Sequence, residues 1–361
     1  MKTHQKTTLL DFRSDTITRP TAAMRQAMAD AIVGDDQYGE DPTVNRLEAL
    51  AADMVGKEEA VYVPSGTMGN VSAMMAHCGR GDEAILGDES HIYWFESGTP
   101  AALGGITQFV LPTEVDGTID SARIESAIRP DRSGYPRTRV ICIENTHNRR
   151  SGRVLPQAYM RQVAQIAAKH DVPIHLDGAR IFNAGAALGV SVPEITAHVD
   201  SVQFCLSKGL AAPVGSVVAG SADFIERVRR QRKLLGGAMR QAGVIAAAGL
   251  VALETMVDRL SEDHVRAKRM ATSLARMDGI SLDPGGVQTN IVVFQVDGSI
   301  DQTQLAERLK ERGLLVSNYG AVGLRMVTHV DVDDADVDKA LDIIGSTVPT
   351  MLEGSGARAA D

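Results

Sequence analysis

The sequence predicts an α/β protein built around a doubly wound, mostly parallel sheet. Short apolar segments of strand length alternate with segments whose apolar residues recur at helical spacing. Polar residues follow several of the apolar segments directly, at the carboxyl ends of strands, where such sheets bind ligands. From about residue 258 the pattern changes to long helices and fewer strands, which predicts a second, smaller α/β domain.

Length and composition agree with this organisation. With 361 residues the chain exceeds most single domains, so one large unit and one smaller unit are expected. A net charge of -9, 4% aromatic residues and scattered arginines argue against a nucleic-acid partner, which would select a basic stripe. No apolar run is long enough to span a membrane and the N-terminus lacks a signal-peptide core, so we expect no membrane association and a cytoplasmic protein.

The three cysteines are expected to be structural. Cys78, Cys142 and Cys205 lie in apolar segments without the short spacings of a zinc site or of a disulfide framework. We therefore expect them to be buried, and the sequence predicts no metal ligands.

The first segments are read as a loop, a helix and a polar turn. Residues 10–21 lack periodicity and predict an ordered loop, and Thr21 is expected to cap a helix that reaches residue 31. A polar, turn-rich stretch at 34–43 then leads into a helix over 44–54. We interpret that polar stretch as a charged loop facing solvent.

The next segment offers a candidate phosphate site. Residues 60–63 form an apolar strand that stops at Pro64 and continues as Ser65-Gly66-Thr67, opening a helix. The backbone N–H groups at a helix N-terminus, with the helix dipole behind them, suit a phosphate. Simple helix capping by the same residues is the alternative.

Further strands are predicted at residues 83–87, 108–111 and 139–144. His91 follows the first of them in an aromatic-rich turn, where an imidazole can stack on a flat cofactor ring or transfer a proton near neutral pH. A hydrogen-bonded core histidine is the alternative. The third strand ends in a polar run that begins at Glu144.

Lys208 is the residue around which the site is predicted. It lies on the turn between core strands at 202–206 and 216–220, where partial desolvation lowers the pKa of an amine and favours attack on a carbonyl. About 30 residues earlier an apolar strand ends at Asp177. A Schiff-base lysine together with a carboxylate for the pyridinium nitrogen is the combination that pyridoxal phosphate requires. Each residue taken alone has a simpler interpretation: Lys208 could be a surface lysine, and Asp177 could cap a helix.

Two arginines later in the chain are candidates for binding anions. Arg240 follows two glycines in a loop, a setting suited to a phosphate. Arg325 interrupts an apolar strand, where a charge needs an anionic partner, either a substrate carboxylate or an internal salt bridge. The expected domains are an arm at 1–20, a large domain at 21–257, a small domain at 258–350 and a disordered tail at 351–361.

Seven motifs in order resemble the low-specificity L-threonine aldolases, a family of pyridoxal-phosphate enzymes with the aspartate-aminotransferase-like fold, fold type I. The resemblance spans residues 10–328 and implies a large domain with a mostly parallel seven-stranded sheet. The motifs are Arg13-Ser14-Asp15-Thr16, the stretch 34–43, Ser65-Gly66-Thr67, Glu144-Asn145-Thr146-His147-Asn148, Asp177-Gly178-Ala179-Arg180, Ser207-Lys208-Gly209 and Met239-Arg240-Gln241.

The resemblance implies a role for each matching residue. Lys208 carries the Schiff base, Asp177 pairs with the pyridine nitrogen, and His91 stacks on the ring. The reaction also needs a base for the β-hydroxyl proton, and His91, directly or through a water, is our candidate for it. The other implied residues bind cofactor or substrate: Gly66, Thr67, Arg180, Ser207 and, from a neighbouring subunit, Arg240 for pyridoxal phosphate; Ser14, His91, Arg180 and Arg325 for the substrate.

The implied reaction is retro-aldol cleavage of L-threonine, L-allo-threonine or a related β-hydroxy-α-amino acid to glycine and an aldehyde. The resemblance also implies a homotetramer, a dimer of dimers with active sites at the dimer interface. A β-eliminating lyase or a transferase acting on another β-substituted amino acid is the alternative within the fold, and a relative that binds cofactor without catalysis is a third reading. The intact lysine, aspartate, histidine and arginine positions argue against the third.

One position departs from the family pattern. Gly134 stands before the Tyr-Pro-Arg-Thr run where many members carry a histidine that holds the β-hydroxyl. We therefore predict weaker discrimination at the substrate Cβ than in relatives with that histidine.

Overall fold

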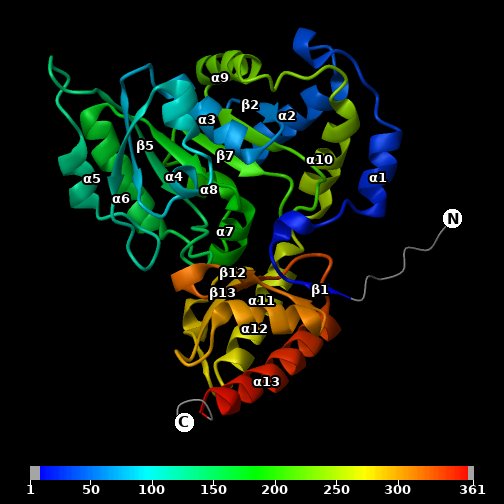
Figure 1. Ribbon diagram of the computed structural model, residues 1–361. Helices are drawn as coiled ribbons and strands as arrows, with labels where there is room; N and C mark the ends of the chain where they lie inside the picture. Colours follow the sequence, from blue (N-terminus) through cyan, green and yellow to red (C-terminus); the bar gives the residue numbers. More distant parts are fainter. Residues whose placement is uncertain (1–8, 357–361) are drawn as a thin grey trace. The chain divides into compact units, whose positions relative to one another are not determined.

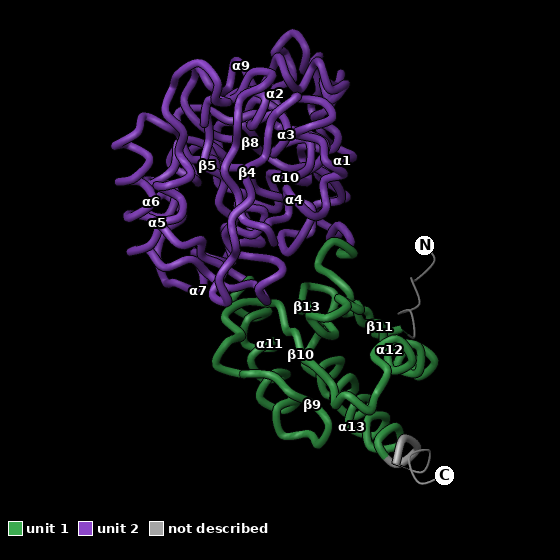
Figure 2. Tube along the Cα trace, turned by 60° about the vertical axis from the view of Figure 1, so that its left-hand side comes forward, with its two compact units in different colours: residues 1–18, 260–361 green, residues 19–259 purple. Residues whose placement is uncertain are grey.

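The computed structural model describes residues 9–356, with side chains described as far as residue 352. The chain forms two compact units (Figures 1 and 2). One comprises residues 19–259, and the other combines the residues up to Thr18 with those from Leu260 onward. The N-terminal segment therefore belongs to the same unit as the C-terminal third of the chain.

The larger unit is built on the predicted seven-stranded sheet. Its strands are mostly parallel, but β8 runs antiparallel to both of its neighbours, β2 and β7. The strand order is β2-β8-β7-β6-β5-β3-β4. The bounds are β2 Glu59–Val63, β3 Glu83–Gly87, β4 Thr107–Leu111, β5 Thr138–Glu144, β6 Ile174–Asp177, β7 Ser201–Cys205 and β8 Ser216–Gly220. Strands β2, β3, β5, β6, β7 and β8 are nearly continuous runs of buried residues, because helices cover both faces of such a sheet.

Helices separate most of the strands, as the periodicity predicts, and β7 and β8 are joined by a turn (Figure 1). Two of the predicted N-caps are made by side chains: Thr21 Oγ1 accepts from the Met24 N–H at 3.2 Å, and Ser65 Oγ accepts from the Met68 N–H at 3.2 Å. The helices are α1 Ala22–Ala29, α2 Pro42–Met54, α3 Gly66–His77, α4 His91–Trp94, α5 Ser121–Ala127, α6 Gln157–His170, α7 Ile181–Leu188, α8 Val192–Thr196, α9 Ala222–Leu234 and α10 Gly243–Thr255, with short turns of helix at η2 Asp36–Tyr38 and η3 Pro100–Gly104.

Helix α3 packs against strands β7 and β8, and its first residue, Gly66, lies against Cys205 and Ser216 on either side of the turn that carries Lys208. One apolar cluster joins α3 to β2, β8 and α9, and a second joins α3 to β3 and β5. Cys78 and Cys142 lie in the second cluster, and all three cysteines are buried and unbridged, as predicted.

The smaller unit contains two short sheets and three long helices. A four-stranded antiparallel sheet has the order β12-β13-β10-β9, and β1 pairs with β11 in parallel. The elements are β1 Leu10–Asp11, η1 Asp15–Ile17, α11 Leu260–Leu274, β9 Ile280–Ser281, η4 Pro284–Gly286, β10 Ile291–Val296, α12 Gln302–Glu311, β11 Leu314–Leu315, β12 Ser317–Asn318, η5 Gly320–Val322, β13 Leu324–Val327 and α13 Asp334–Gly356.

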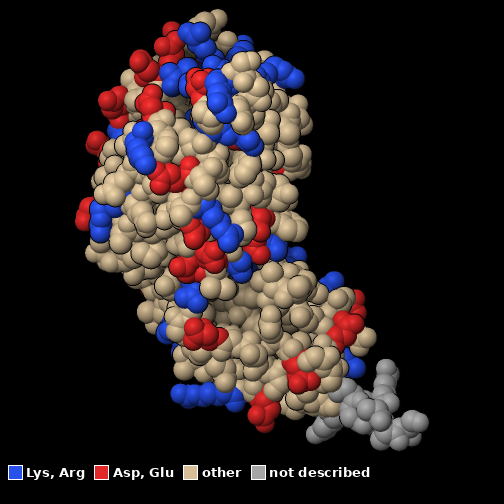
Figure 3. Space-filling model, turned by 90° about the vertical axis from the view of Figure 1, so that its left-hand side faces the viewer, with Lys and Arg blue, Asp and Glu red and all other residues tan. Residues whose placement is uncertain are grey.

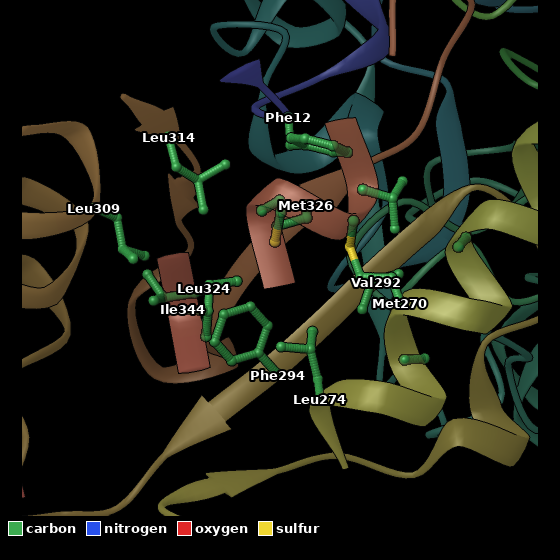
Figure 4. Packing of buried hydrophobic residues seen from close by; sticks show 14 of the residues in the cluster. Phe12, Met270, Leu274, Val292, Phe294, Leu309, Leu314, Leu324, Met326 and Ile344 are labelled. Carbon is green, nitrogen blue, oxygen red and sulfur yellow. The ribbon is translucent and has the colours of Figure 1, made fainter. Parts of the chain in front are cut away.

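The core of this unit shows where the sequence-based expectations fail (Figure 4). Phe12 lies in a loop, as expected, but it is fully buried among residues of the C-terminal elements, including Phe294 and Met326, which its sequence context does not indicate. Residues 314–318 form two short strands and not one, because the chain changes partner at Val316 from β1 to β13. Helix α13 continues through residues 351–356, which were expected to be disordered, because Met351 and Leu352 pack against this core. The rest of the predicted tail lies outside the described residues.

The surface and the helices add two observations. On the face drawn in Figure 3, acidic and basic side chains are intermixed rather than gathered by sign. Among residues 9–356, no helix is both long enough and apolar enough to cross a membrane.

Candidate active site

The polar residues predicted at strand ends lie at one edge of the large sheet. Strands β3, β5, β6 and β7 are mutually parallel, so their carboxyl ends share that edge. His91 follows β3, Glu144 ends β5, Asp177 ends β6 and Lys208 follows β7. The structure therefore brings the three predicted catalytic residues to the same edge of one unit.

Asp177 has a buried carboxylate that accepts two hydrogen bonds. Only 2% of the residue is exposed. Its Oδ2 accepts a hydrogen bond from Asn70 Nδ2 at 2.9 Å, and its Oδ1 accepts from the backbone N–H of Ala179 at 3.1 Å. Both contacts come from N–H donors, which suit the acceptor oxygens of a carboxylate. Asp177 is therefore a buried acceptor that can pair with a cationic N–H group.

His91 is held on both its backbone and its ring. Its N–H donates to Glu144 Oε2 at 2.6 Å, and its Nδ1 lies 2.9 Å from Glu96 Oε1. Glu96 is almost fully buried and also accepts a hydrogen bond from Asn70 Nδ2 at 2.8 Å. One ring nitrogen of His91 and one carboxylate oxygen each of Glu96 and Asp177 all lie within 4.8 Å of one another. The imidazole is therefore fixed beside two carboxylates.

This cluster changes the proton affinity of its members. Burial lowers the pKa of His91, but the hydrogen bond to Glu96 and the charges of Asp177 and Glu144 outweigh burial and raise it, against the opposing charge of Lys208. Burial raises the pKa of Glu96, and the hydrogen bond from His91 opposes that rise. His91 consequently binds a proton more tightly in this cluster than an imidazole does in water.

Lys208 lies on the predicted turn and is half-buried. The turn is tight: the Ala211 N–H donates to the Lys208 carbonyl at 2.8 Å, and Ala211 has a φ of +62°. Gly215, which closes the turn, has a φ of +106°, and a Cβ there would lie 2.4 Å from Tyr62 Oη. Only glycine fits at this position, so the loop that presents the lysine is sterically determined.

The candidate phosphate corner lies at the first turn of α3. A Cβ on Gly66 would lie 3.0 Å from Cys205 Sγ and 3.6 Å from Ser216 Oγ, so glycine keeps this corner open. Ser216 Oγ is buried and has no hydrogen-bond partner among the described residues. An added hydrogen-bond acceptor or donor would therefore satisfy an otherwise unpaired hydroxyl.

Arg240 is exposed and pairs with Asp35 of the same chain, with 2.9 Å between Nη1 and Oδ2. The glycine-rich loop that precedes it passes against the first turn of α3, because a Cβ on Gly237 would overlap Met68 Sδ at 2.0 Å. Binding of a phosphate by Arg240 stays a prediction, as do the roles of Gly66, Thr67 and Ser207.

The predicted substrate-binding residues are divided between the two units. Arg180 belongs to the larger unit, is buried, and has Nη1 3.5 Å from Asn148 Oδ1. Ser14 and Arg325 belong to the smaller unit. Arg325 is buried in β13, donates from Nη2 to the Arg13 carbonyl at 3.1 Å and stacks its guanidinium 4.3 Å from the centre of the Tyr319 ring. Ser14 caps η1 by accepting from the Thr16 N–H at 3.2 Å. Their roles stay predictions.

Sequence reasoning missed Glu96 and Asn70 as members of the site. Glu96 follows His91 by five residues, a spacing that does not place two side chains together on a regular helix. Helix α4 ends at Trp94, and the chain then turns so that Glu96 comes back to the ring. Asn70 lies inside α3, where the structure buries it. Neither has a local signal.

Gly134 lies at the opposite edge of the sheet from the candidate site, near the amino ends of the parallel strands. It sits in the loop before β5, whose first residue, Thr138, pairs with Glu83 at the start of β3. Strand β5 has seven residues, so about 20 Å separates this loop from the carboxyl edge. A side chain at position 134 therefore does not reach His91 within the same chain.

The fold and the sequence match a known class of enzymes. The family model described as "Beta-eliminating lyase" matches residues 11–297. The solved structure of a putative L-allo-threonine aldolase from Listeria monocytogenes superposes with a TM-score of 0.77 at 19% identity, covering 96% of this chain and 98% of that one. Together they define an α/β lyase of fold type I and confirm the predicted fold class.

Relatives of closer sequence narrow the assignment. Low-specificity L-threonine aldolase 1 of Arabidopsis thaliana is 47% identical over 351 residues, which is 96% of this chain and 98% of the relative. The low specificity L-threonine aldolase of Escherichia coli K12 is 44% identical over 324 residues, 90% of this chain and 95% of the relative. The chain belongs to the low-specificity L-threonine aldolase family, which confirms the resemblance found in its motifs.

Proposed function

We propose that this protein is a pyridoxal-phosphate-dependent aldolase that cleaves L-threonine, L-allo-threonine or a related β-hydroxy-α-amino acid to glycine and an aldehyde. The observation that carries the proposal is the shared sheet edge at which Lys208, the buried Asp177 and the Glu96-bound His91 meet, in a chain of this family. Each of the three has the chemistry that its role requires.

The residues at this edge fit pyridoxal phosphate. Asp177 offers a buried anion for the pyridinium nitrogen, Lys208 offers an amine for the aldehyde, and the open corner at Gly66 and Thr67 beside the unpaired Ser216 hydroxyl suits the phosphate. When bound, the cofactor supplies an electron-accepting ring that stabilises negative charge on the substrate Cα. Ser207, Arg180 and, from a neighbouring subunit, Arg240 complete the proposed cofactor-binding set.

The chain's own residues bind the substrate and move the proton. The Nδ1 contact with Glu96 fixes the imidazole of His91 and leaves Nε2 to take the β-hydroxyl proton. Ser14, Arg180 and Arg325 are proposed to hold the substrate carboxylate, which sets the orientation of the Cα–Cβ bond. His91 also stacks on the cofactor ring in this proposal.

Assembly and cellular role are part of the same proposal. We infer a cytoplasmic homotetramer, a dimer of dimers with active sites at the dimer interface, that serves glycine formation and threonine breakdown. The resemblance puts position 134 beside the substrate, and since this position lies at the sheet edge away from His91, that role would require the site of another chain. The exposed Arg240 suits a contribution across the same kind of interface.

A second candidate is elimination at Cβ, favoured by the description of the matching family model. The same lysine and aspartate would serve a β-eliminating lyase or a transferase acting on another leaving group. The products separate the two reactions, since elimination gives a 2-oxo acid and ammonia whereas aldol cleavage gives glycine and an aldehyde.

The test is the absorbance spectrum of the purified protein, followed by addition of L-threonine, L-allo-threonine and L-phenylserine with quantification of glycine and aldehyde. We expect a cofactor band that Lys208→Ala abolishes and that exposed Lys233→Ala retains, with glycine released from at least one substrate. A band without glycine would refute the aldolase and favour elimination. Absence of a band would refute the cofactor site.

A further inference from the structure

A buried chain of polar side chains runs away from the candidate active site behind Asp177. His77 Nε2 lies 2.8 Å from Ser201 Oγ, and the same oxygen lies 2.9 Å from His175 Nδ1. His175 Nε2 lies 3.1 Å from Asn70 Oδ1. Asn70 then reaches both Asp177 and Glu96 through Nδ2, so the chain ends at the carboxylates beside His91.

The carboxylates determine the direction of every hydrogen bond in this chain. Asn70 must present its NH₂ group to Glu96 and Asp177, because ionised carboxylates only accept. Its Oδ1 therefore accepts from His175, which must carry its proton on Nε2. His175 Nδ1 then accepts the Ser201 hydroxyl proton, and Ser201 Oγ accepts from His77 Nε2–H. All donors point toward the active site.

Burial supports the neutral rings that this order requires. His175, Ser201 and Asn70 are at most 1% exposed. Burial lowers the pKa of His175 to about 4, and burial with nearby positive charge lowers the pKa of His77 to about 3. Both rings are therefore neutral near pH 7, with one donor and one acceptor nitrogen each.

We propose that Asn70 is a positioning residue that joins Asp177 to the Glu96–His91 pair, and that His175, Ser201 and His77 hold its amide in the required orientation. The proposal rests on the proposed function in one respect, since that function assigns Asp177 and His91 to the cofactor. A single amide supplies one N–H to each carboxylate and so bridges the two acids. Rotation of the amide by half a turn would place its oxygen against both.

The consequence is a predictable effect of Asn70 on the proton affinity of the cluster. The charged groups facing His91 are Glu96, Asp177, Glu144 and Lys208. Removing the two N–H donors takes positive dipole ends away from Glu96 and Asp177, so the potential at His91 becomes more negative and its pKa rises. A rise of about one unit is expected for loss of hydrogen bonds to charged acceptors.

The experiment is histidine NMR on the full-length protein as purified, labelled with ¹⁵N in its histidines. Long-range ¹H–¹⁵N correlations near pH 7 report which ring nitrogen of His175 carries the proton, with the signal assigned from its loss in His175→Gln. Titration then gives the pKa of His91 in the unchanged protein, in Asn70→Leu and in Ser72→Ala. Ser72 is the matched control, because it is fully buried on the same helix and, among the described residues, its hydroxyl donates to the Gly69 carbonyl at 3.0 Å and not to the cluster.

We expect His175 to be neutral and protonated on Nε2, and Asn70→Leu to raise the pKa of His91 by about one unit while Ser72→Ala leaves it in place. A His175 protonated on Nδ1 would overturn the proposal even if Asn70→Leu fails to fold, because Asn70 would then have to turn its oxygen toward the carboxylates. An unchanged His91 pKa in folded Asn70→Leu would overturn it too. A protein with the expected values that releases no glycine would refute the aldolase and leave this assignment intact.

Discussion

Replacing Glu96 by glutamine removes the negative charge that rests against His91 and keeps the size of the side chain. In the wild type burial is the largest influence on the pKa of His91 and, with the charge of Lys208, lowers it, while the hydrogen bond to Glu96 is the largest of the contributions that raise it. A hydrogen bond to a buried charged group contributes about 1.5–3 kcal/mol, which corresponds to about 1–2 pKa units. In Glu96→Gln, burial should dominate and the pKa of His91 should fall by about that amount.

The assay is the pH dependence of glycine release, measured between about pH 5 and about pH 9. The proposed base must be neutral to accept the β-hydroxyl proton, so activity rises as His91 loses its proton. The rising limb should move to lower pH in Glu96→Gln, while exposed Glu226→Gln on α9 serves as the control and should keep the wild-type profile.

Stability should respond in the corresponding direction. Because the folded-state pKa of His91 is raised, its contribution to the free energy of unfolding is fully present below the ordinary pKa near 6.5 and is lost as pH rises through the raised value.

The activity profile decides the assignment. If the rising limb of glycine release against pH stays in place in folded, cofactor-loaded Glu96→Gln, His91 is not the base positioned by Glu96.

Three further changes test other parts of the structure. The pKa of His175, lowered to about 4 by burial, predicts a loss of about 3 kcal/mol of stability as pH falls from 6.5 to 4, because the unfolded chain takes up a proton that the folded chain does not. In urea unfolding, the free energy of unfolding should therefore fall less steeply with decreasing pH in His175→Gln than in exposed His170→Gln. Equal pH dependence in the two variants would contradict the burial effect. A Cβ on Gly69 would lie 2.6 Å from Gln203 Cγ, so Gly69→Ala should cost about 1–3 kcal/mol by urea unfolding, whereas a variant as stable as wild type would show that the strand β7 side chain can move aside. Gly134→His should sharpen threo/allo discrimination in the assembled protein. The substitution should cost about 1 kcal/mol of stability, because the backbone φ at this position is +97°. Unchanged discrimination in a folded, assembled variant would show that this position does not determine the selectivity at Cβ.

The pattern of residues in the larger unit made most of its elements predictable. Strand β3 and strand β8 have the bounds expected from their apolar runs, and Thr21 and Ser65 begin helices through the hydrogen bonds expected of caps. These signals are local, because burial on both faces and capping leave their mark in neighbouring residues. Prediction was weaker in the smaller unit, where the pairing of β1 with β11 joins residues about 300 apart and no local pattern encodes it.

The sequence by itself determined the family, the alternation of strands and helices, and the identity of the lysine and aspartate at the strand ends. Each of these depends on residue type and on short spacing along the chain. Only the tertiary structure decided that Glu96 returns to His91 and that Asn70 bridges Glu96 and Asp177, because these contacts join separate elements through the ends of their side chains. A buried carboxylate is stabilised by the donors packed around it, and packing is a property of the folded chain.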